Sequence, residues 1–239
     1  MSAGTELPRS PTGVAGLDAA TGGGLPAGRT TVVRGARGTG KTVLALHLVS
    51  HAARALGERA VVVSFDEAPS DLAMNARTLG VDLPQLVAAA HIAIVDATTS
   101  PHELSVVVGE YDLSGLQART ESAVERIGAT LVLFDAAERL LLEPYRAGVT
   151  GPELARVCAA LRRRGVASLI TTAARPDRDR EHAQRVDNMI VLRRRRRGDD
   201  RRGTLEVEML RGAAHHHGEL AFVIDPERGV TVGDAATPA

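Results

Sequence analysis

The sequence has 239 residues, of which 44% are hydrophobic, and its 29 basic residues balance 29 acidic ones, so the net charge is +0 at pH 7. This length suits one large α/β domain, and the apolar fraction is sufficient for a real core, which argues against a disordered chain. The zero net charge gives no overall electrostatic reason to expect a nucleic acid or an acidic membrane as a partner.

Short β-rich segments alternate with helical patterns along most of the chain, which is typical of βαβ units and a largely parallel sheet. We predict strands over residues 30–34, 60–65, 92–96, 130–134 and 167–171. We predict helices over residues 41–56, 70–79, 83–90, 112–127 and 152–164. Three further predicted strands, 189–192, 204–210 and 220–224, follow without helices between them, as expected of an antiparallel hairpin added to the edge of the sheet.

The two ends of the chain depart from this pattern. Residues 1–10 are polar and include Pro8, which predicts a flexible lead-in, and residues 234–239 predict a flexible tail. No internal repeat and no long linker divides the remainder, so we predict one domain over residues 11–233.

The sequence has no feature that indicates secretion or a membrane. Cys158 is the single cysteine and cannot form an internal disulfide, which fits a reducing compartment. The N-terminus lacks the basic start and apolar stretch of a signal peptide, and no apolar run approaches the roughly 20 residues that cross a bilayer. We therefore expect a cytoplasmic protein.

Lysine is confined to one position. Arginine accounts for 28 of the 29 basic residues, and Lys41 is the only lysine. Arginine serves a solvated surface equally well, but it cannot replace lysine where a compact ammonium must enter a tight phosphate cradle. The single lysine therefore marks a site that requires one.

Residues 35–42, with the sequence GARGTGKT, match the phosphate-loop pattern G-x-x-x-x-G-K-[ST]. This loop follows a predicted strand and opens a predicted helix, a context that a chance glycine-rich turn would lack. The glycines let successive N–H groups and the start of the helix point at phosphate oxygens. Lys41 is expected to bridge the β- and γ-phosphates of ATP, and Thr42 to hold Mg²⁺ through its hydroxyl. The predicted nucleotide-binding residues of the loop are Gly35, Gly38, Thr39, Gly40, Lys41 and Thr42.

Acidic residues follow two of the predicted strands. Asp135 ends an apolar strand and is expected to support Mg²⁺ through water, although such an aspartate considered alone is more often a cap for the next turn. Asp66 and Glu67 directly follow the strand 61–65, whose end is expected to lie beside the phosphate loop. A carboxylate there can orient or deprotonate the attacking water, and a solvated acidic loop that caps the next helix is the alternative.

The loop lies within longer segments that resemble KaiC-type ATPases of the RecA superfamily. These segments are TGVAGLD at residues 12–18, GGGLPAGR at 22–29, SFDEAPSD at 64–71 and LRG at 210–212, and the resemblance covers roughly residues 11–233. It implies an α/β fold of the RecA-like P-loop NTPase type, with a mostly parallel central sheet, helices on both faces and a C-terminal antiparallel β extension. KaiC has two such domains in tandem, and this chain has one.

The resemblance also implies a homo-oligomer, a hexameric ring with ATP at each subunit interface. It matches Glu67 to the catalytic glutamate of the family, and Asp66 to a position that often holds a second glutamate. Arg211 and His215 match residues that reach the nucleotide of the neighbouring subunit. Lys41 and Arg211 would then stabilise the charge that develops as water attacks the γ-phosphate.

Two positions depart from the family. Met209 stands where KaiC-like sequences place a lysine that also reaches across the interface, and Ala136 stands where the family commonly has serine. Both departures imply slow hydrolysis, so we expect a slow, Mg²⁺-dependent ATPase that acts as a nucleotide-driven ring or regulatory switch. A nucleotide-sensing scaffold with negligible hydrolysis is the alternative, and a RecA-type DNA-binding recombination protein is a third hypothesis.

Two further clusters have alternative interpretations. The arginines of residues 193–202 surround a turn signal, which predicts a solvated hairpin tip, with docking of a partner protein or a nucleic acid as alternatives. Aromatic residues make up 2% of the chain, which leaves little to stack on bases and counts against nucleic acid. His215, His216 and His217 are adjacent and cannot easily present three imidazoles to one ion, so we expect no metal other than Mg²⁺.

Overall fold

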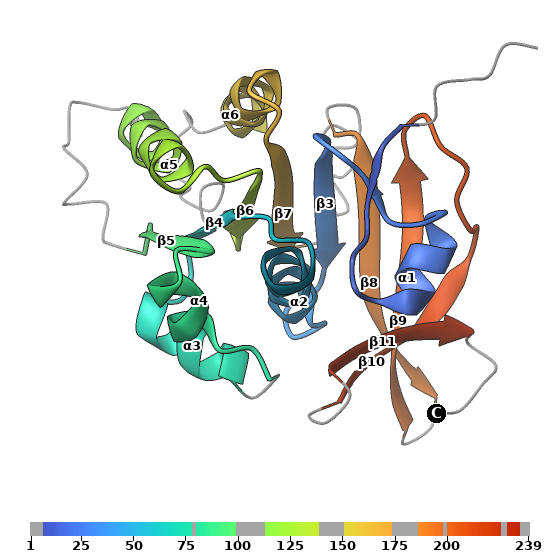
Figure 1. Ribbon diagram of the computed structural model, residues 1–239. Coiled ribbons are helices and arrows are strands. Elements are labelled where there is room, and N and C mark those ends of the chain that lie inside the picture. The colour runs from blue at the N-terminus through green and yellow to red at the C-terminus, as the bar shows by residue number, and fades with distance from the viewer. Residues whose placement is uncertain are drawn as a thin grey trace, which may run out of the picture.

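A mixed β-sheet forms the centre of the protein, with helices packed against it (Figure 1). The computed structural model describes residues 7–77, 80–98, 113–138, 151–173, 186–197, 200–225 and 229–234. In this part of the chain the strands of the sheet are β3 (Thr30–Gly35), β4 (Ala60–Ser64), β5 (Ile92–Asp96), β6 (Leu131–Asp135), β7 (Ala167–Ala173), β8 (Asn188–Arg197), β9 (Asp200–Leu210), β10 (Glu219–Asp225) and β11 (Gly229–Asp234). Their order across the sheet is β11-β10-β9-β8-β3-β7-β6-β4-β5.

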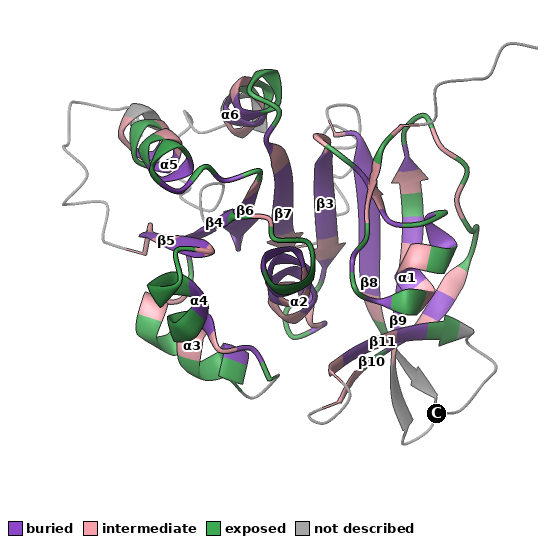
Figure 2. Ribbon diagram, in the orientation of Figure 1, coloured by how far each residue is buried: buried purple, intermediate pink, exposed green. Residues whose placement is uncertain are grey.

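The middle of the sheet is parallel and buried on both faces. β8, β3, β7, β6, β4 and β5 pair in parallel in that order, and β9, β10 and β11 continue antiparallel from β8. Val61, Val62 and Val63 are consecutive residues of β4 and all are fully buried, and Figure 2 shows similar burial along much of β3 and β7 and the first half of β8. An apolar run in which every residue is buried requires cover on both faces, as in α/β proteins.

Helices supply this cover on the two faces of the parallel strands (Figure 1). The helices of the described residues are α1 (Ala15–Ala20), α2 (Lys41–Ala55), α3 (Pro69–Arg77), α4 (Leu83–Ala88), α5 (Leu113–Ile127) and α6 (Gly151–Arg163). On one face, Leu44 of α2, Leu72 of α3 and Leu83 of α4 join one hydrophobic cluster. On the other face, Val124 of α5 and Leu161 of α6 join a second cluster. The predicted α/β class, with a mostly parallel sheet and a C-terminal antiparallel extension, is confirmed.

The predicted elements agree with the structure in type, and their ends differ by a few residues. The main difference concerns the first of the three terminal strands, because β8 pairs in parallel with β3 and so extends the parallel part of the sheet. Sequence patterns missed α1, β11 and the short strands β1 (Arg9–Ser10) and β2 (Leu25–Pro26), which pair with each other. Such short elements carry too little periodicity to be recognised.

Ordered structure extends beyond the predicted domain boundaries at both ends. Residues 9–10 form β1 where the sequence predicts a lead-in, and Arg9 Nη1 donates a hydrogen bond to the carbonyl oxygen of Thr21 at 2.7 Å. At the other end β11 runs to Asp234. The rest of the predicted lead-in and tail, residues 1–6 and 235–239, lies outside the described part of the chain. None of the helices described above combines the length and the apolar character needed to span a membrane.

Candidate functional site

The loop that joins β3 to α2 requires its glycines. Gly38 and Gly40 have φ angles of 73° and 96°, which residues with a side chain disfavour. A Cβ on Gly40 would also come within 2.5 Å of Ile224 Cδ1 on β10, and a Cβ on Gly35 within 2.7 Å of the carbonyl oxygen of Leu192 on β8. The loop is therefore packed closely against the C-terminal strands, in the curled form in which backbone N–H groups gather around an anion.

Lys41 begins α2 and is largely buried, with 9% of its surface exposed. Its ammonium nitrogen donates hydrogen bonds to the carbonyl oxygens of Gly35 at 2.9 Å and Ala36 at 3.0 Å. Burial lowers the pKa of Lys41, while the nearby carboxylates of Glu138 and Asp135 act to raise it. The ammonium thus lies inside the loop, where the lysine of a phosphate loop meets its ligand.

Asp135 ends β6 and is buried, with 2% of its surface exposed. Its carboxylate accepts hydrogen bonds from Thr42 Oγ1, at 3.0 Å from Oδ1 and 3.1 Å from Oδ2, and from Thr171 Oγ1 at 2.7 Å. Thr171 lies on β7, and its hydroxyl accepts the backbone N–H of Ala136 at 2.8 Å, so its own proton is left for Asp135. Burial raises the pKa of Asp135, while the hydrogen bonds from Thr171 and Thr42 act to lower it. The fold brings together the two predicted Mg²⁺ ligands and adds Thr171, which no local sequence pattern marks.

Asp66 and Glu67 follow β4, which is not the neighbour of the strand that leads into the loop. β7 and β6 lie between β3 and β4, yet the end of β4 lies beside the loop, as expected. The two residues follow Ser64, which pairs with Asp135 in the register of β4 and β6. Asp66 Oδ2 also lies 4.0 Å from Nη2 of Arg37, a residue of the loop. The predicted acidic pair therefore joins the site through its proximity to Asp135.

Glu67 is held by two side chains. Asn75 Nδ2, on α3, donates a hydrogen bond to Glu67 Oε2 at 2.9 Å. Ser64 Oγ donates to the backbone carbonyl oxygen of Glu67 at 2.6 Å. The first contact fixes the carboxylate and the second fixes the backbone from which it extends, so this carboxylate is well placed to orient a small ligand such as water.

A further acidic residue, Glu138, lies three residues after Asp135, in the turn that follows β6. Its Oε2 is buried and has no hydrogen-bond partner among the described residues, which is a costly state for a carboxylate oxygen. The carboxylates of Glu138 and Asp135 both act to raise the pKa of Lys41. No sequence pattern singled out Glu138, although its spacing of three residues from Asp135 suits one face of a turn. The resulting excess of carboxylates favours a ligand that includes a cation.

Arg211 and His215 do not lie near the loop of their own chain. β9 runs antiparallel to β8, so its last residue, Leu210, pairs with Asn188 at the start of β8. The loop follows the end of β3, so it lies at the opposite end of these strands. Arg211 is exposed, and Nδ1 of His215 lies within hydrogen-bond distance of a backbone carbonyl oxygen of its own turn. These two predicted residues are therefore separated from the rest of the site within one chain.

The arginine-rich segment forms the predicted hairpin, because β8 and β9 pair up to Arg197 opposite Asp200. Arg193 is paired with Glu206 and, at 3.4 Å, with Glu219. The hairpin tip, residues 198–199, lies outside the described part of the chain. At Arg193 at least, acidic neighbours balance the positive charge, and the docking of a partner on this hairpin stays a prediction.

The adjacent histidines do not form a metal site with their described neighbours. The ring centroids of His215 and His217 are 4.6 Å apart, and the rings are tilted by 54°. Within the residues that the structure describes, no group of three or more His, Cys, Asp or Glu side chains could hold a metal ion by itself. A cation near Thr42 and Asp135 would therefore need ligands from water or from a bound phosphate.

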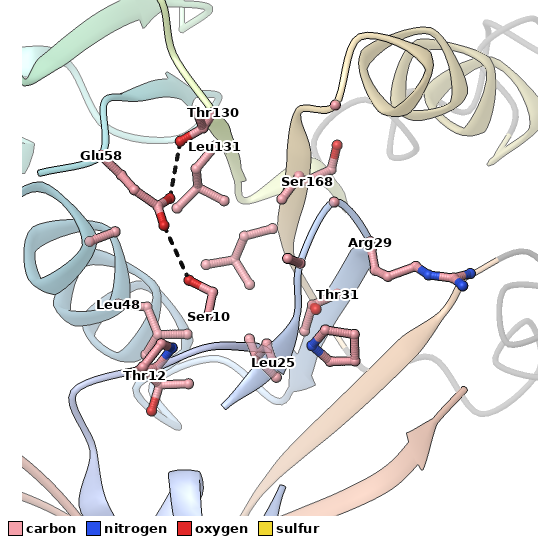
Figure 3. A pocket seen from close by; sticks show the side chains of 18 residues that line it. Ser10, Thr12, Leu25, Arg29, Thr31, Leu48, Glu58, Thr130, Leu131 and Ser168 are labelled. Atoms are coloured by element: carbon pink, nitrogen blue, oxygen red, sulfur yellow. Dashed lines mark hydrogen bonds between the residues drawn. The ribbon is translucent and has the colours of Figure 1, made fainter. Parts of the chain in front are cut away.

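A pocket of about 250 Å³ lies at the N-terminal ends of the parallel strands, opposite the end that bears the phosphate loop (Figure 3). Its lining includes Thr31 and Leu131, near the starts of β3 and β6. Glu58 accepts hydrogen bonds there from Thr130 Oγ1 at 3.0 Å and Ser10 Oγ at 3.4 Å. Open α/β sheets bind their ligands at the carboxyl ends of the strands, so this pocket is separate from the phosphate loop.

Comparisons with known proteins agree with this geometry. Residues 10–237 match a family model described as "ATPase: KaiC". The chain is 36% identical over 222 residues to the circadian clock oscillator protein KaiC of Rippkaea orientalis, covering 89% of this chain and 42% of that protein. It is 37% identical over 222 residues to the circadian clock oscillator protein KaiC 1 of Synechocystis sp., with the same coverage of 89% and 42%. The chain thus spans about two fifths of the length of the curated relatives it matches, 42% in both cases.

Proposed function

Because the chain belongs to the KaiC family of ATPases, we propose that it binds ATP with Mg²⁺ on the loop after β3 and hydrolyses it slowly. The main support is the contact between Thr42 Oγ1 and the Asp135 carboxylate, 3.0 Å apart beside the loop. A hydroxyl and a carboxylate in this position are the groups that P-loop enzymes use at Mg²⁺. The proposed nucleotide-binding residues are Gly35, Gly38, Thr39, Gly40, Lys41, Thr42, Asp135 and, from a neighbouring subunit, His215.

The residues of the site fit a nucleoside triphosphate and its metal ion. Among the described residues, the Lys41 ammonium donates hydrogen bonds only to loop carbonyl oxygens, and a phosphate oxygen is a stronger partner for it. Thr42 would bind Mg²⁺ directly and Asp135 would bind it through water. When bound, Mg²⁺ neutralises charge on the β- and γ-phosphates. The excess of carboxylates around Lys41 makes nucleotide binding depend on this cation.

Glu67 is the proposed group that orients the attacking water, with Asp66 beside it. Its carboxylate is held by Asn75 at 2.9 Å, so it can accept a proton from water at a fixed position. The water oxygen forms a bond to the γ-phosphorus, and the bond from that phosphorus to the bridging oxygen breaks. Lys41 stabilises the charge that accumulates on the phosphate oxygens.

We propose that the protein assembles head to tail into a ring, hexameric by family resemblance, with ATP between subunits. Arg211 and His215 lie at the opposite end of the strands from the loop of their own chain. A head-to-tail contact brings different surfaces of successive subunits together, so it can place these residues beside the loop of the next subunit. Arg211 of one subunit would then stabilise transition-state charge on the next. Met209 cannot provide the second cation, which supports slow turnover.

A nucleotide-sensing scaffold with negligible hydrolysis is the second candidate. The observation that favours it is Met209, an uncharged residue where the resemblance places an interfacial lysine. In that case ATP would control assembly, and the hairpin of residues 193–202 is a candidate docking segment for a partner protein. Nucleic acid is a weaker candidate there, because Arg193 is already paired with Glu206 and Glu219.

Steady-state phosphate release by the wild type, Lys41→Ala and Glu67→Gln separates these candidates, with particle mass measured with and without ATP. We expect slow release by the wild type, less by both variants, and a larger particle with ATP. Release by the wild type equal to that of Lys41→Ala would leave only the scaffold. An ATP-dependent, salt-sensitive gel shift on single-stranded DNA would instead support the recombination hypothesis.

A further inference from the structure

Arg194 lies on the face of the sheet that bears the phosphate loop. β8 pairs with β3 up to Leu192, which is opposite Gly35, so the residues after Leu192 run alongside the loop. Side chains of a strand alternate between its two faces. Ile190 and Leu192 belong to the hydrophobic cluster that includes α2, and Arg194 is the next residue of the same alternation. The strand register therefore directs Arg194 toward the start of α2.

The guanidinium of Arg194 lies against the loop at Gly38. A Cβ on Gly38 would be 3.6 Å from Nη1 and 3.9 Å from Cζ of Arg194, which is van der Waals contact. Arg194 is exposed, and within the described part of the chain its charge is not paired with a carboxylate. Arg193, on the other face of β8, is by contrast paired with Glu206 and Glu219. The loop thus has a neighbouring cation that no described acid neutralises.

We propose that Arg194 is a second phosphate-binding cation of this site, supplied by the same chain as the loop; this inference rests on the proposed binding of ATP. A guanidinium stays charged at physiological pH and presents several coplanar donors, a geometry that matches phosphate oxygens. Lys41 is the only lysine, and Met209 leaves the interface without one. Arg37, an arginine of the loop itself, faces Asp66 at 4.0 Å. Arg194 therefore compensates within the subunit for a cation missing from the interface.

The test compares affinities for ATP and for adenosine, which has no phosphate, by displacement of a fluorescent ATP analogue. Arg194→Gln should weaken ATP binding about tenfold, the effect of one charge-assisted hydrogen bond, and should leave adenosine binding unchanged. Arg194→Lys should recover part of the loss, because it restores the charge without the planar donors. Arg126→Gln, at an exposed position on α5, is the matched control and should bind ATP as the wild type does.

Arg194→Gln with wild-type affinity for ATP would overturn the inference, and so would an equal loss for ATP and adenosine. Melting temperatures without ligand show whether Arg194→Gln is folded. If it is not folded, the affinities of Arg194→Lys for ATP and adenosine are compared instead. Because the measurement is binding, a wild type that binds ATP without hydrolysing it would contradict the proposed hydrolysis and leave this test intact. A wild type that binds no ATP would refute both.

Discussion

Thr42 donates its hydroxyl hydrogen to the buried carboxylate of Asp135, with its oxygen 3.0 Å from Oδ1 and 3.1 Å from Oδ2. The two residues are 93 positions apart in the chain. Thr42 lies in the first turn of α2, and Asp135 ends β6, which β7 separates from β3. The contact therefore requires the loop to carry the start of α2 from the end of β3 past β7 to the end of β6. It links the phosphate loop to the acidic residues of the site.

The pKa of Lys41 is expected to lie below that of a free lysine, because burial disfavours its ammonium. Lys41 is the only lysine, so protein labelled with ¹³C at lysine Cε gives one side-chain signal whose titration reports this pKa directly. Glu138→Gln should lower the pKa further, since Glu138 acts to raise it. Glu125→Gln, which removes an ion pair with Arg164 elsewhere on the surface, should leave the pKa unchanged. A pKa at or above that of free lysine would show that the ammonium is not buried in the loop.

Gly40→Ala should reduce the free energy of unfolding by about 2–4 kcal/mol, from two separate causes. Its φ of 96° disfavours any side chain, and the new methyl group would meet Ile224 Cδ1 at 2.5 Å. Gly57→Ala isolates the first cause, since Gly57 has a φ of 66° and open space around its Cβ position. Urea unfolding measures both variants. Equal losses would mean that β10 does not press on the loop.

The phosphate loop could be predicted because its residues are contiguous and its chemistry is local. The role of Asp135 could also be predicted, because an apolar run precedes it in the sequence. Thr171 and Arg194 could not be found in this way, because their proximity depends on β7 and β8 being the two neighbours of β3. The sequence gives no pattern that states strand order or register. Glu67 was predicted as a site residue because it follows an apolar strand, and it lies near Asp135 because that strand, β4, pairs with β6.

Strand direction explains a further limit of prediction from the sequence. Arg211 follows β9, and only the antiparallel pairing of β9 with β8 places it at the far edge from the loop. A linear sequence cannot separate residues that complete a site within one chain from residues that serve a neighbour. Within one chain, the structure places Arg211 and His215 away from the loop and Arg194 in contact with Gly38.

Asn75→Ala should lower the rate of ATP hydrolysis about tenfold while ATP affinity stays the same. Asn75 donates to Glu67 Oε2 at 2.9 Å, so its loss frees the carboxylate proposed to orient water but leaves the phosphate loop intact. Single-turnover phosphate release and equilibrium binding measure the two quantities separately. Met74→Ala, at the adjacent and exposed position of α3, is the control. Equal weakening of binding and rate in Asn75→Ala would point to a general distortion and contradict this positioning.

The charged form of Asp135 is expected to destabilise the protein when no ligand is bound. Burial raises the pKa of its carboxyl, so the folded state holds this proton more tightly than the unfolded chain does. Stability therefore falls as pH rises from the ordinary aspartate pKa through the raised one. Asp135→Asn removes this titration. Over the same rise in pH, the melting temperature of the variant should therefore rise relative to that of the wild type.

Thermal melts from acidic to neutral pH measure this difference. Asp71→Asn, at an exposed position of α3, should show no such gain. Asp135→Asn should also lose the additional stabilisation that Mg²⁺ gives to the ADP-bound protein, because a carboxamide is a poorer partner for Mg²⁺-bound water. A melting difference that is independent of pH would contradict the buried, titrating carboxyl.

The binding of ATP by this loop is tested most directly by calorimetric titration of the wild type and Lys41→Ala with ATP and Mg²⁺. The wild type should bind one ATP per chain, and Lys41→Ala should lose about a hundredfold in affinity, because the phosphates lose their ammonium partner. Melting temperatures without ligand confirm that both proteins are folded. Equal affinity of Lys41→Ala and the wild type for ATP would contradict the assignment of the nucleotide to the loop from Gly35 to Thr42.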